Sequence, residues 1–257
     1  MSDNLEIKND FKSYFYSFLE DKKNLKIFFY EIFCHGSIYA VGGFFRDFLN
    51  YKKCRDLDLI VDIDNNILID ILENHRLIYA VNRHNGIKLI LDDVELDVWC
   101  IQDNWAFKNK LVKLNERDKL LSIAKGCFYN YDSLVINLNR FTYNLQYYSD
   151  FVKSKTLDIL QKNTSYKTLN PTIEANIIRA FYLKNKYQVQ FSDNTRNYLI
   201  LSLKLLDSWY KNDFERLLII KDKYPKYTDF SEVQLFYELE VFKSNVDYEE
   251  NIQLSLF

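Results

Sequence analysis

Two glycines, followed about a dozen residues later by an Asp-x-Asp pair, constrain this chain more than any other feature. Ile38 to Val41 is a short apolar run, Gly42 and Gly43 follow it, and Phe44 to Leu49 has helical spacing. A second strand is predicted from Leu57 to Val61. The sequence therefore predicts a strand, a tight turn, a helix and a second strand in succession.

The acidic pair, Asp56 and Asp58, stands at the start of that second strand. Residues two apart in a strand point to the same face, so the two carboxylates lie side by side while Leu57 and Leu59 face the core. Carboxylate oxygens are the ligands that magnesium prefers, and an Asp-x-Asp can bridge a pair of ions. We expect two Mg²⁺ ions as the cofactor, with Mn²⁺ as a substitute.

A third carboxylate is expected from a neighbouring strand, because a metal that activates a hydroxyl and binds a triphosphate needs ligands on more than one side. Gly86 to Leu91 and Val94 to Trp99 read as two strands joined at an Asp-Asp turn. Asp97 is the predicted third ligand. Glu95 lies on the same face and is the alternative.

The glycine pair predicts a phosphate site. Without side chains, Gly42 and Gly43 let backbone N–H groups approach a triphosphate closely. The helix that follows directs its positive end toward the phosphates, and Arg46 either contacts them or pairs with an acidic neighbour. Asp47, the next residue, is assigned to the same nucleotide-binding segment.

Each feature alone is ordinary, and their order carries the inference. That order, from Val41 to Asp47 and from Arg55 to Val61, resembles the head domain of CCA-adding enzymes and bacterial poly(A) polymerases, within the polymerase-beta-like nucleotidyltransferases. The resemblance implies an α+β fold: a nucleotidyltransferase head (palm-like) domain over residues 1–125, with a mixed sheet and flanking helices, then a mostly helical neck over residues 126–257.

The same resemblance implies an enzyme that takes a nucleoside triphosphate and releases pyrophosphate. Asp56, Asp58 and Asp97 are then both catalytic residues and metal ligands. Gly42 and Gly43 bind phosphate together with Arg46 and Asp47.

The chain departs from this family in its second half. Phe128 to Val135 resembles the motif that links head and neck, although both of its arginines are missing, and Phe141 to Asn144 is the other placement. The helical base-selecting motif is reduced to Glu174 to Ala180, without its acidic and basic base-reading pair. Arg179 survives and either contacts a base or triphosphate or covers apolar surface. Nucleotide choice is therefore expected to differ from that of CCA-adding enzymes.

The acceptor is expected to be small, or the protein itself. Thirty-four basic and thirty-six acidic residues give a net charge of -2, so there is no global positive field to gather a long nucleic acid. After head and neck, no room is expected for a tRNA-holding body and tail. Ser255 is a candidate primer hydroxyl. The alternative is that the C-terminal segment only packs against the protein through Leu254, Leu256 and Phe257. Trp105 and Phe107 are read as core residues, with base stacking as the other reading.

Short stand-alone enzymes of this kind resemble the nucleotidyltransferase of the Hailong anti-phage system, which makes a deoxyadenylate oligomer that controls a membrane effector. That resemblance implies a dATP-polymerising enzyme in anti-phage defence, with a membrane effector or toxin encoded nearby as partner. Three alternatives stay open: an RNA 3′-end nucleotidyltransferase, a transferase of single nucleotides onto a partner protein, and a non-catalytic nucleotide-binding regulator.

Neither a signal peptide nor a membrane span is predicted. The N-terminus is acidic, and no window approaches the roughly eighteen apolar residues that a span requires. A cytoplasmic protein without membrane insertion is expected. The four cysteines, which form no CxxC, are predicted to be buried thiols.

Overall fold

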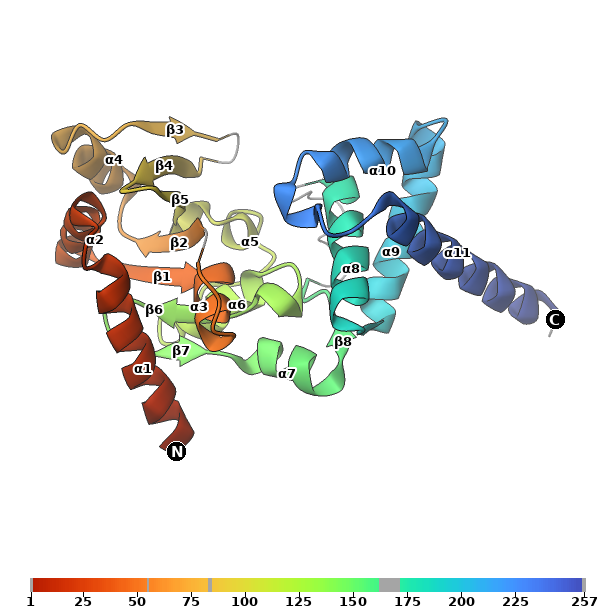
Figure 1. Cartoon of the computed structure of the whole chain (residues 1–257), viewed down its shortest axis with the longest axis horizontal. Coiled ribbons are helices and arrows are strands. Elements are labelled where there is room, and N and C mark those ends of the chain that lie inside the picture. Colours follow the sequence, from red (N-terminus) through yellow and green to blue (C-terminus); the bar gives the residue numbers. More distant parts are fainter. Residues whose placement is uncertain (1, 55, 83–84, 162–171, 256–257) are drawn as a thin grey trace. The chain divides into compact units, whose positions relative to one another are not determined.

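The computed structural model describes residues 2–54, 56–82, 85–161 and 172–255, with side chains described between residues 5 and 246. The chain forms two compact units, Met1–Ser149 and Asp150–Phe257. The first unit combines a sheet with helices, and the second is mostly helical (Figure 1). The predicted α+β class is confirmed.

The first unit is built on a seven-stranded mixed sheet with the order β3-β4-β5-β2-β1-β6-β7. The pairing of β2 with β5 is parallel, and the other five pairings are antiparallel. The strands are β1 (Ser37–Val41), β2 (Asp56–Asp62), β3 (Tyr79–Val81), β4 (Ile87–Leu91), β5 (Val94–Cys100), β6 (Val135–Asn137) and β7 (Tyr143–Asn144). The predicted strand, turn, helix and strand are β1, the glycine turn, α3 and β2.

The N-terminal part of the chain forms two helices, with a break after Leu19. Further helices follow β1, β2 and β5 along the chain, and α7 runs across the division between the two units. These helices are α1 (Ser2–Leu19), α2 (Lys23–His35), α3 (Gly43–Leu49), α4 (Asn65–Asn74), α5 (Trp105–Lys108), α6 (Lys119–Gly126) and α7 (Gln146–Ser154).

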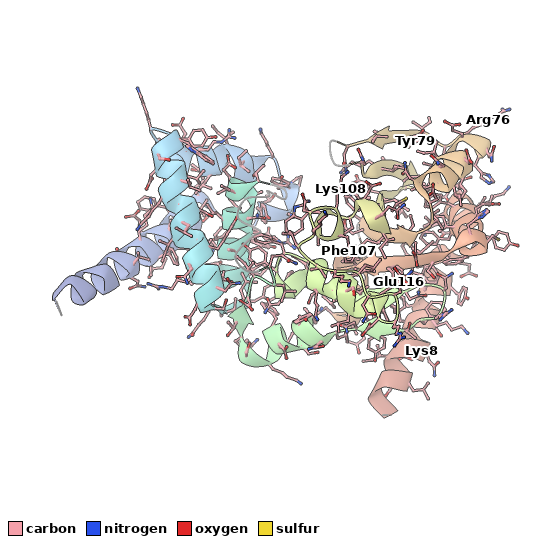
Figure 2. All side chains as sticks on the ribbon, turned by 180° about the vertical axis from the view of Figure 1, so that it is seen from behind. Lys8, Arg76, Tyr79, Phe107, Lys108 and Glu116 are labelled. Carbon is pink, nitrogen blue, oxygen red and sulfur yellow. The ribbon has the colours of Figure 1, made fainter. Side chains whose placement is uncertain are left out.

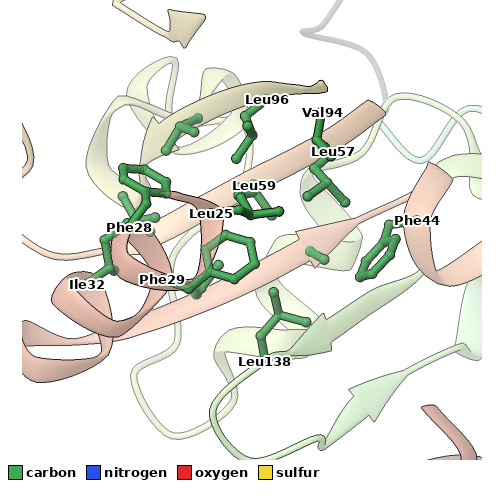
Figure 3. Packing of buried hydrophobic residues seen from close by; sticks show 14 of the residues in the cluster. Leu25, Phe28, Phe29, Ile32, Phe44, Leu57, Leu59, Val94, Leu96 and Leu138 are labelled. Atoms are coloured by element: carbon green, nitrogen blue, oxygen red, sulfur yellow. The ribbon is translucent and has the colours of Figure 1, made fainter. Parts of the chain in front are cut away.

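One face of the sheet carries the main core. Helix α2 packs Phe28 and Phe29 against this face, close to Leu57 and Leu59 of β2 and Leu96 of β5 (Figure 3). All five side chains are buried, and each contributes about 1.5–3 kcal/mol of burial free energy. Because strand residues alternate, the burial of these leucines turns the acidic residues between them to the other face.

The other face is covered at one end by a smaller apolar cluster around α6. It consists of Tyr39, Ile60, Ile101, Ile123, Ala124 and Val135, with Phe107 among the partly buried residues packed against it. Figure 2 shows Phe107 and Lys108 on α5. Asp58 and Glu95, which lie on this face beyond the cluster, are exposed. The sheet therefore presents an open acidic area beside a covered apolar one.

In its described residues, the second unit contains four helices of ten residues or more and a two-stranded parallel sheet. Its core includes Phe181, whose ring lies 5.5 Å from that of Phe191 and 5.6 Å from that of Phe242. The elements are β8 (Thr156–Leu157), α8 (Ile173–Tyr187), β9 (Gln190–Phe191), α9 (Asp193–Trp209), α10 (Asp213–Asp222) and α11 (Glu232–Ser255).

The cysteine prediction is partly wrong. Cys100 is buried, but Cys34 near the end of α2 is exposed, because it stands on the side of the amphipathic helix that does not face the sheet. All four cysteines are free. Within the described residues, none of the helices is long and apolar enough to span a membrane.

Candidate active site

The register between β2 and β5 brings the predicted acids together. In this parallel pair Asp58 lies opposite Asp97, and Asp56 lies opposite Glu95. Register partners point to the same face, so four carboxylates from two adjacent strands share one area of the sheet. The predicted acid set is therefore placed on one face, with the alternative ligand Glu95 among it.

The glycine turn lies beside these carboxylates. Val41, the last residue of β1, pairs with Asp58, and Gly42 and Gly43 follow directly. A β-carbon built on Gly43 would lie 3.9 Å from Asp56 Oδ1. Gly42 has a φ of 66° and a ψ of −105°, a backbone conformation that side chains rarely tolerate. The backbone of the turn therefore approaches the acidic area without intervening side chains.

Of the two roles predicted for Arg46, the structure shows the ion pair. Its Nη1 donates to Asp132 Oδ1 at 3.3 Å, and its guanidinium lies 4.4 Å from the ring centre of Tyr131. Its side chain is only 16% exposed. Both partners of Arg46 belong to the segment from Phe128 to Val135, which resembles the head-to-neck motif. The same segment contacts the glycine turn, because the carbonyl oxygen of Leu134 accepts a hydrogen bond from the backbone N–H of Gly42.

Asp47 of α3 lies near Tyr14 and Cys54, and its charge acts on both. Burial, together with the negative charges of Cys54 and Asp47, raises the pKa of the Tyr14 hydroxyl to about 12. Burial also raises the pKa of the Cys54 thiol to about 12, helped by the carboxylates of Asp47 and Asp56. Asp47 therefore contributes negative charge beside Tyr14 and Cys54.

Asp97 is held by one oxygen only. Its Oδ2 lies 3.2 Å from Lys88 Nζ, and its Oδ1 is buried without a hydrogen-bond partner in the described part of the chain. A buried carboxylate oxygen without a partner is costly, and a cation or an ordered water would relieve that cost.

Carboxylate oxygens are the type of ligand that a hard divalent cation prefers. Among the described residues, no three His, Cys, Asp or Glu side chains converge on a preformed metal cage. Mg²⁺ does not require such a cage, since it keeps several waters and is often bound by one or two carboxylates together with substrate phosphates. The unpartnered oxygen of Asp97 and the adjacent carboxylates of β2 match that open type of site.

Lys88, Tyr131 and Asp132 were not predicted from the sequence. For Lys88 a signal was present: a two-residue turn at Asp92 and Asp93 pairs Leu91 with Val94, which fixes the later pairing of Lys88 with Asp97. Tyr131 and Asp132 lie in the segment from Phe128 to Val135 that resembles the head-to-neck motif, but their contact with Arg46 could not be predicted, because it joins segments 86 residues apart.

In the second unit, Glu174 is tied to α10, since Arg216 Nε donates to its Oε1 at 2.9 Å. Ala175 and Ile178, at motif positions that lack the base-reading pair, are buried. Arg179 lies on the same helix, α8. Ser255 is the last residue of α11, and its side chain lies outside the described residues. Arg55, in the motif before Asp56, lies outside them as well.

The reading of Trp105 and Phe107 as core residues fits their contacts. Phe107 packs against the smaller apolar cluster, and the Trp105 ring lies 6.2 Å from that of Phe128. The Trp105 indole nitrogen is buried without a partner in the described part of the chain.

Comparison by sequence gives no relative: no protein-family model matches the chain, and no curated protein matches it. Comparison by structure does. A CCA-adding enzyme with CTP superposes with a TM-score of 0.60 and 14% identity, over 87% of this chain and 52% of that one. The chain shares the fold of about half of a CCA-adding enzyme.

Two further structures agree. The Thermotoga maritima CCA-adding enzyme complexed with tRNA has a TM-score of 0.58 at 16% identity, over 87% of this chain and 52% of that one. A tRNA nucleotidyltransferase with a primer tRNA and an ATP analogue has a TM-score of 0.52 at 15% identity, over 81% of this chain and 57% of that one. The chain thus spans about half the length of these enzymes. At this low sequence identity, the superpositions show a shared fold and nothing more.

Proposed function

We propose that this chain is a divalent-metal-dependent nucleotidyltransferase. The observation that carries the proposal is the register of β2 and β5, which places Asp58 beside Asp97 on one face, next to the turn at Gly43. Carboxylates from two strands together with a side-chain-free turn are what a metal-bound triphosphate requires. The fold shared with CCA-adding enzymes supports the same reaction class.

In this proposal Asp56 and Asp58 hold two divalent ions, and Asp97 completes the site. The ions supply charge neutralisation and a more acidic acceptor hydroxyl. The acceptor hydroxyl releases its proton to water and its oxygen bonds to the α-phosphorus of the nucleotide, while the bond from that phosphorus to the oxygen bridging to the β-phosphate breaks and pyrophosphate leaves. The turn at Gly42 and Gly43 positions the triphosphate, so catalysis is mainly positioning and electrostatics.

We further propose that the enzyme polymerises nucleotides without a template into a short oligonucleotide, with dATP as the leading substrate and anti-phage signalling as the role. Two features support an acceptor other than tRNA. The net charge of -2 gives little attraction for a long polyanion. The buried Ala175 and Ile178 leave the base-reading positions of the family motif without polar groups.

The test incubates the pure protein with Mg²⁺ and each labelled ribo- and deoxyribonucleotide, without RNA. An oligonucleotide on a gel, or a protein mass raised by nucleotide units, is the expected result, and an Asp56→Ala, Asp58→Ala variant should give neither. A Ser255→Ala variant separates priming by the protein from free synthesis, because unchanged product would remove Ser255 as primer. No incorporation in these mixtures would refute synthesis without RNA, and no incorporation in the tRNA incubation described below as well would refute the enzyme assignment.

An RNA 3′-end nucleotidyltransferase is the second candidate, favoured by the tRNA-processing enzymes among the similar structures. A parallel incubation with tRNA lacking its 3′ end decides between the two. Incorporation that depends strictly on added tRNA would support this candidate and exclude the small or internal acceptor.

A further inference from the structure

Lys88 is the basic residue that touches the acidic area from β4. It is the register partner of Asp97 in the β4 and β5 hairpin, and its ammonium lies 3.2 Å from Asp97 Oδ2. Its side chain is 61% exposed and that of Asp97 is 27% exposed. The pair is therefore reachable by solvent ions and is held by strand pairing at its base.

The contact has a cost for the proposed metal site. A carboxylate that faces an ammonium at hydrogen-bond distance has part of its negative charge already compensated, so a second cation gains less from it. The other oxygen of Asp97 is buried without a partner among the described residues, so the ammonium does not satisfy the whole group. Asp97 is thus half-compensated and still favours a further cation.

We propose that Lys88 competes with the divalent metal for Asp97 and acts as a positioning residue that sets the metal affinity of the site. This inference rests on the proposed function, since it requires a metal at Asp97. When the ion binds, the ammonium is displaced from Oδ2 and, being on an exposed strand position, turns toward solvent or toward substrate phosphates.

Removal of the competing charge should tighten metal binding. For a solvent-exposed ion pair of this kind, Lys88→Met is expected to lower the Kd for Mn²⁺ by about two- to fivefold. Lys88→Arg keeps the positive charge and should stay close to the wild-type value. Lys12→Met is the matched control, because Lys12 is an exposed lysine on α1, which packs against the opposite face of the sheet.

The measurement is the electron paramagnetic resonance signal of free Mn²⁺ during titration of the full chain, with circular dichroism to verify folding of each variant. The ratio of the wild-type and Lys88→Met Kd values should fall toward one between about 0.05 M and about 0.5 M KCl, since salt screens an exposed ion pair. A difference in protein stability alone would not produce that convergence.

Asp58→Asn and Asp97→Asn separate this inference from the proposed function. If both weaken Mn²⁺ binding but Lys88→Met does not tighten it, the competition is refuted and the metal site stands. If neither affects Mn²⁺ binding, the metal site itself is refuted, and the competition with it. Tighter binding in Lys88→Met but not in Lys12→Met supports the proposal.

Discussion

At the scale of single residues, Gly42 and Gly43 differ in what a side chain would meet. Gly42 has a φ of 66°, so an alanine is strained there whatever the space. At Gly43 the nearest atoms to an added β-carbon are Arg46 Nη2 and Asp56 Oδ1, both at 3.9 Å, which is ordinary contact. The fold thus requires glycine at the first position and leaves room for a methyl group at the second.

Alanine at each position should therefore separate stability from activity. Gly42→Ala is expected to lower the free energy of unfolding by about 1–3 kcal/mol. For Gly43→Ala, the free energy of unfolding should stay within about 0.5 kcal/mol of the wild-type value. The same variant should reduce nucleotide incorporation on the order of tenfold or more, because its methyl group stands where the triphosphate would approach Asp56. Urea denaturation and incorporation assays measure the two effects. Full activity in Gly43→Ala would contradict the phosphate-binding role of the turn.

At the scale of elements, an ion pair between Lys119 and Asp62 links the start of α6 to β2. Lys119 Nζ lies 2.6 Å from Asp62 Oδ2 and 2.8 Å from Glu116 Oε2. Burial lowers the pKa of Lys119, but its hydrogen bonds to Asp62 and Glu116 outweigh that effect and raise the pKa to about 12. Since the folded pKa is above the ordinary 10.5, the ion pairs stabilise the fold below pH 10.5, and that contribution is lost as the pH rises through 12.

Lys119→Met should consequently lower the free energy of unfolding by about 1 kcal/mol at pH 8, after allowance for solvent screening. The gap between wild type and variant should be constant up to about pH 10 and close toward pH 12. Chemical denaturation at a series of pH values measures it. Lys113→Met, which removes an exposed lysine before α6, is the control. If the difference in the free energy of unfolding between wild type and Lys119→Met instead widens with pH, the ion pair of Lys119 with Asp62 does not link α6 to β2.

The sequence was informative wherever structure follows from local periodicity. The alternation around Asp56 and Asp58 predicted β2 and its polar face, and the Asp-Asp turn predicted the β4 and β5 hairpin. The parallel pairing of β2 with β5 could not be read in this way, because it depends on contacts between distant segments. Strand β3 was missed since it has only three residues and buries none of them fully.

Some of the connections between elements are equally invisible to local patterns. Asp92 in the hairpin turn accepts hydrogen bonds from the backbone N–H of Leu25 at 3.0 Å and from the side-chain amide of Asn24 at 2.8 Å. The first turn of a helix has backbone N–H groups without partners inside the helix, and Asp92 provides one of them at the start of α2 with an acceptor from 67 residues away. The sequence predicts only a turn at Asp92. The turn also orients the helix that covers the main core, and this second role needed the structure.

At the scale of the whole molecule, the candidate metal ligands, the glycine turn and the core around them lie in one unit. Both apolar clusters described for the first unit use residues no later than Tyr148, and the four acids and the glycine turn lie within the same limits. The division between the units falls inside α7, so a fragment that respects the helix ends at Ser154.

A fragment of residues 1–154 should fold alone and bind Mn²⁺ like the full chain. Its size and continuous core are sufficient for an independent domain, and its Kd should stay within about twofold of the full-length value because the candidate ligands are all present. If Arg179 on α8 binds the nucleotide, as the family resemblance implies, nucleotide incorporation should nevertheless be lost, since the fragment lacks it. Circular dichroism with urea, Mn²⁺ titration and an incorporation assay separate these outcomes. A fragment that binds Mn²⁺ and also retains full incorporation would remove the second unit from catalysis, whereas one without a cooperative transition would show that the first core depends on the second.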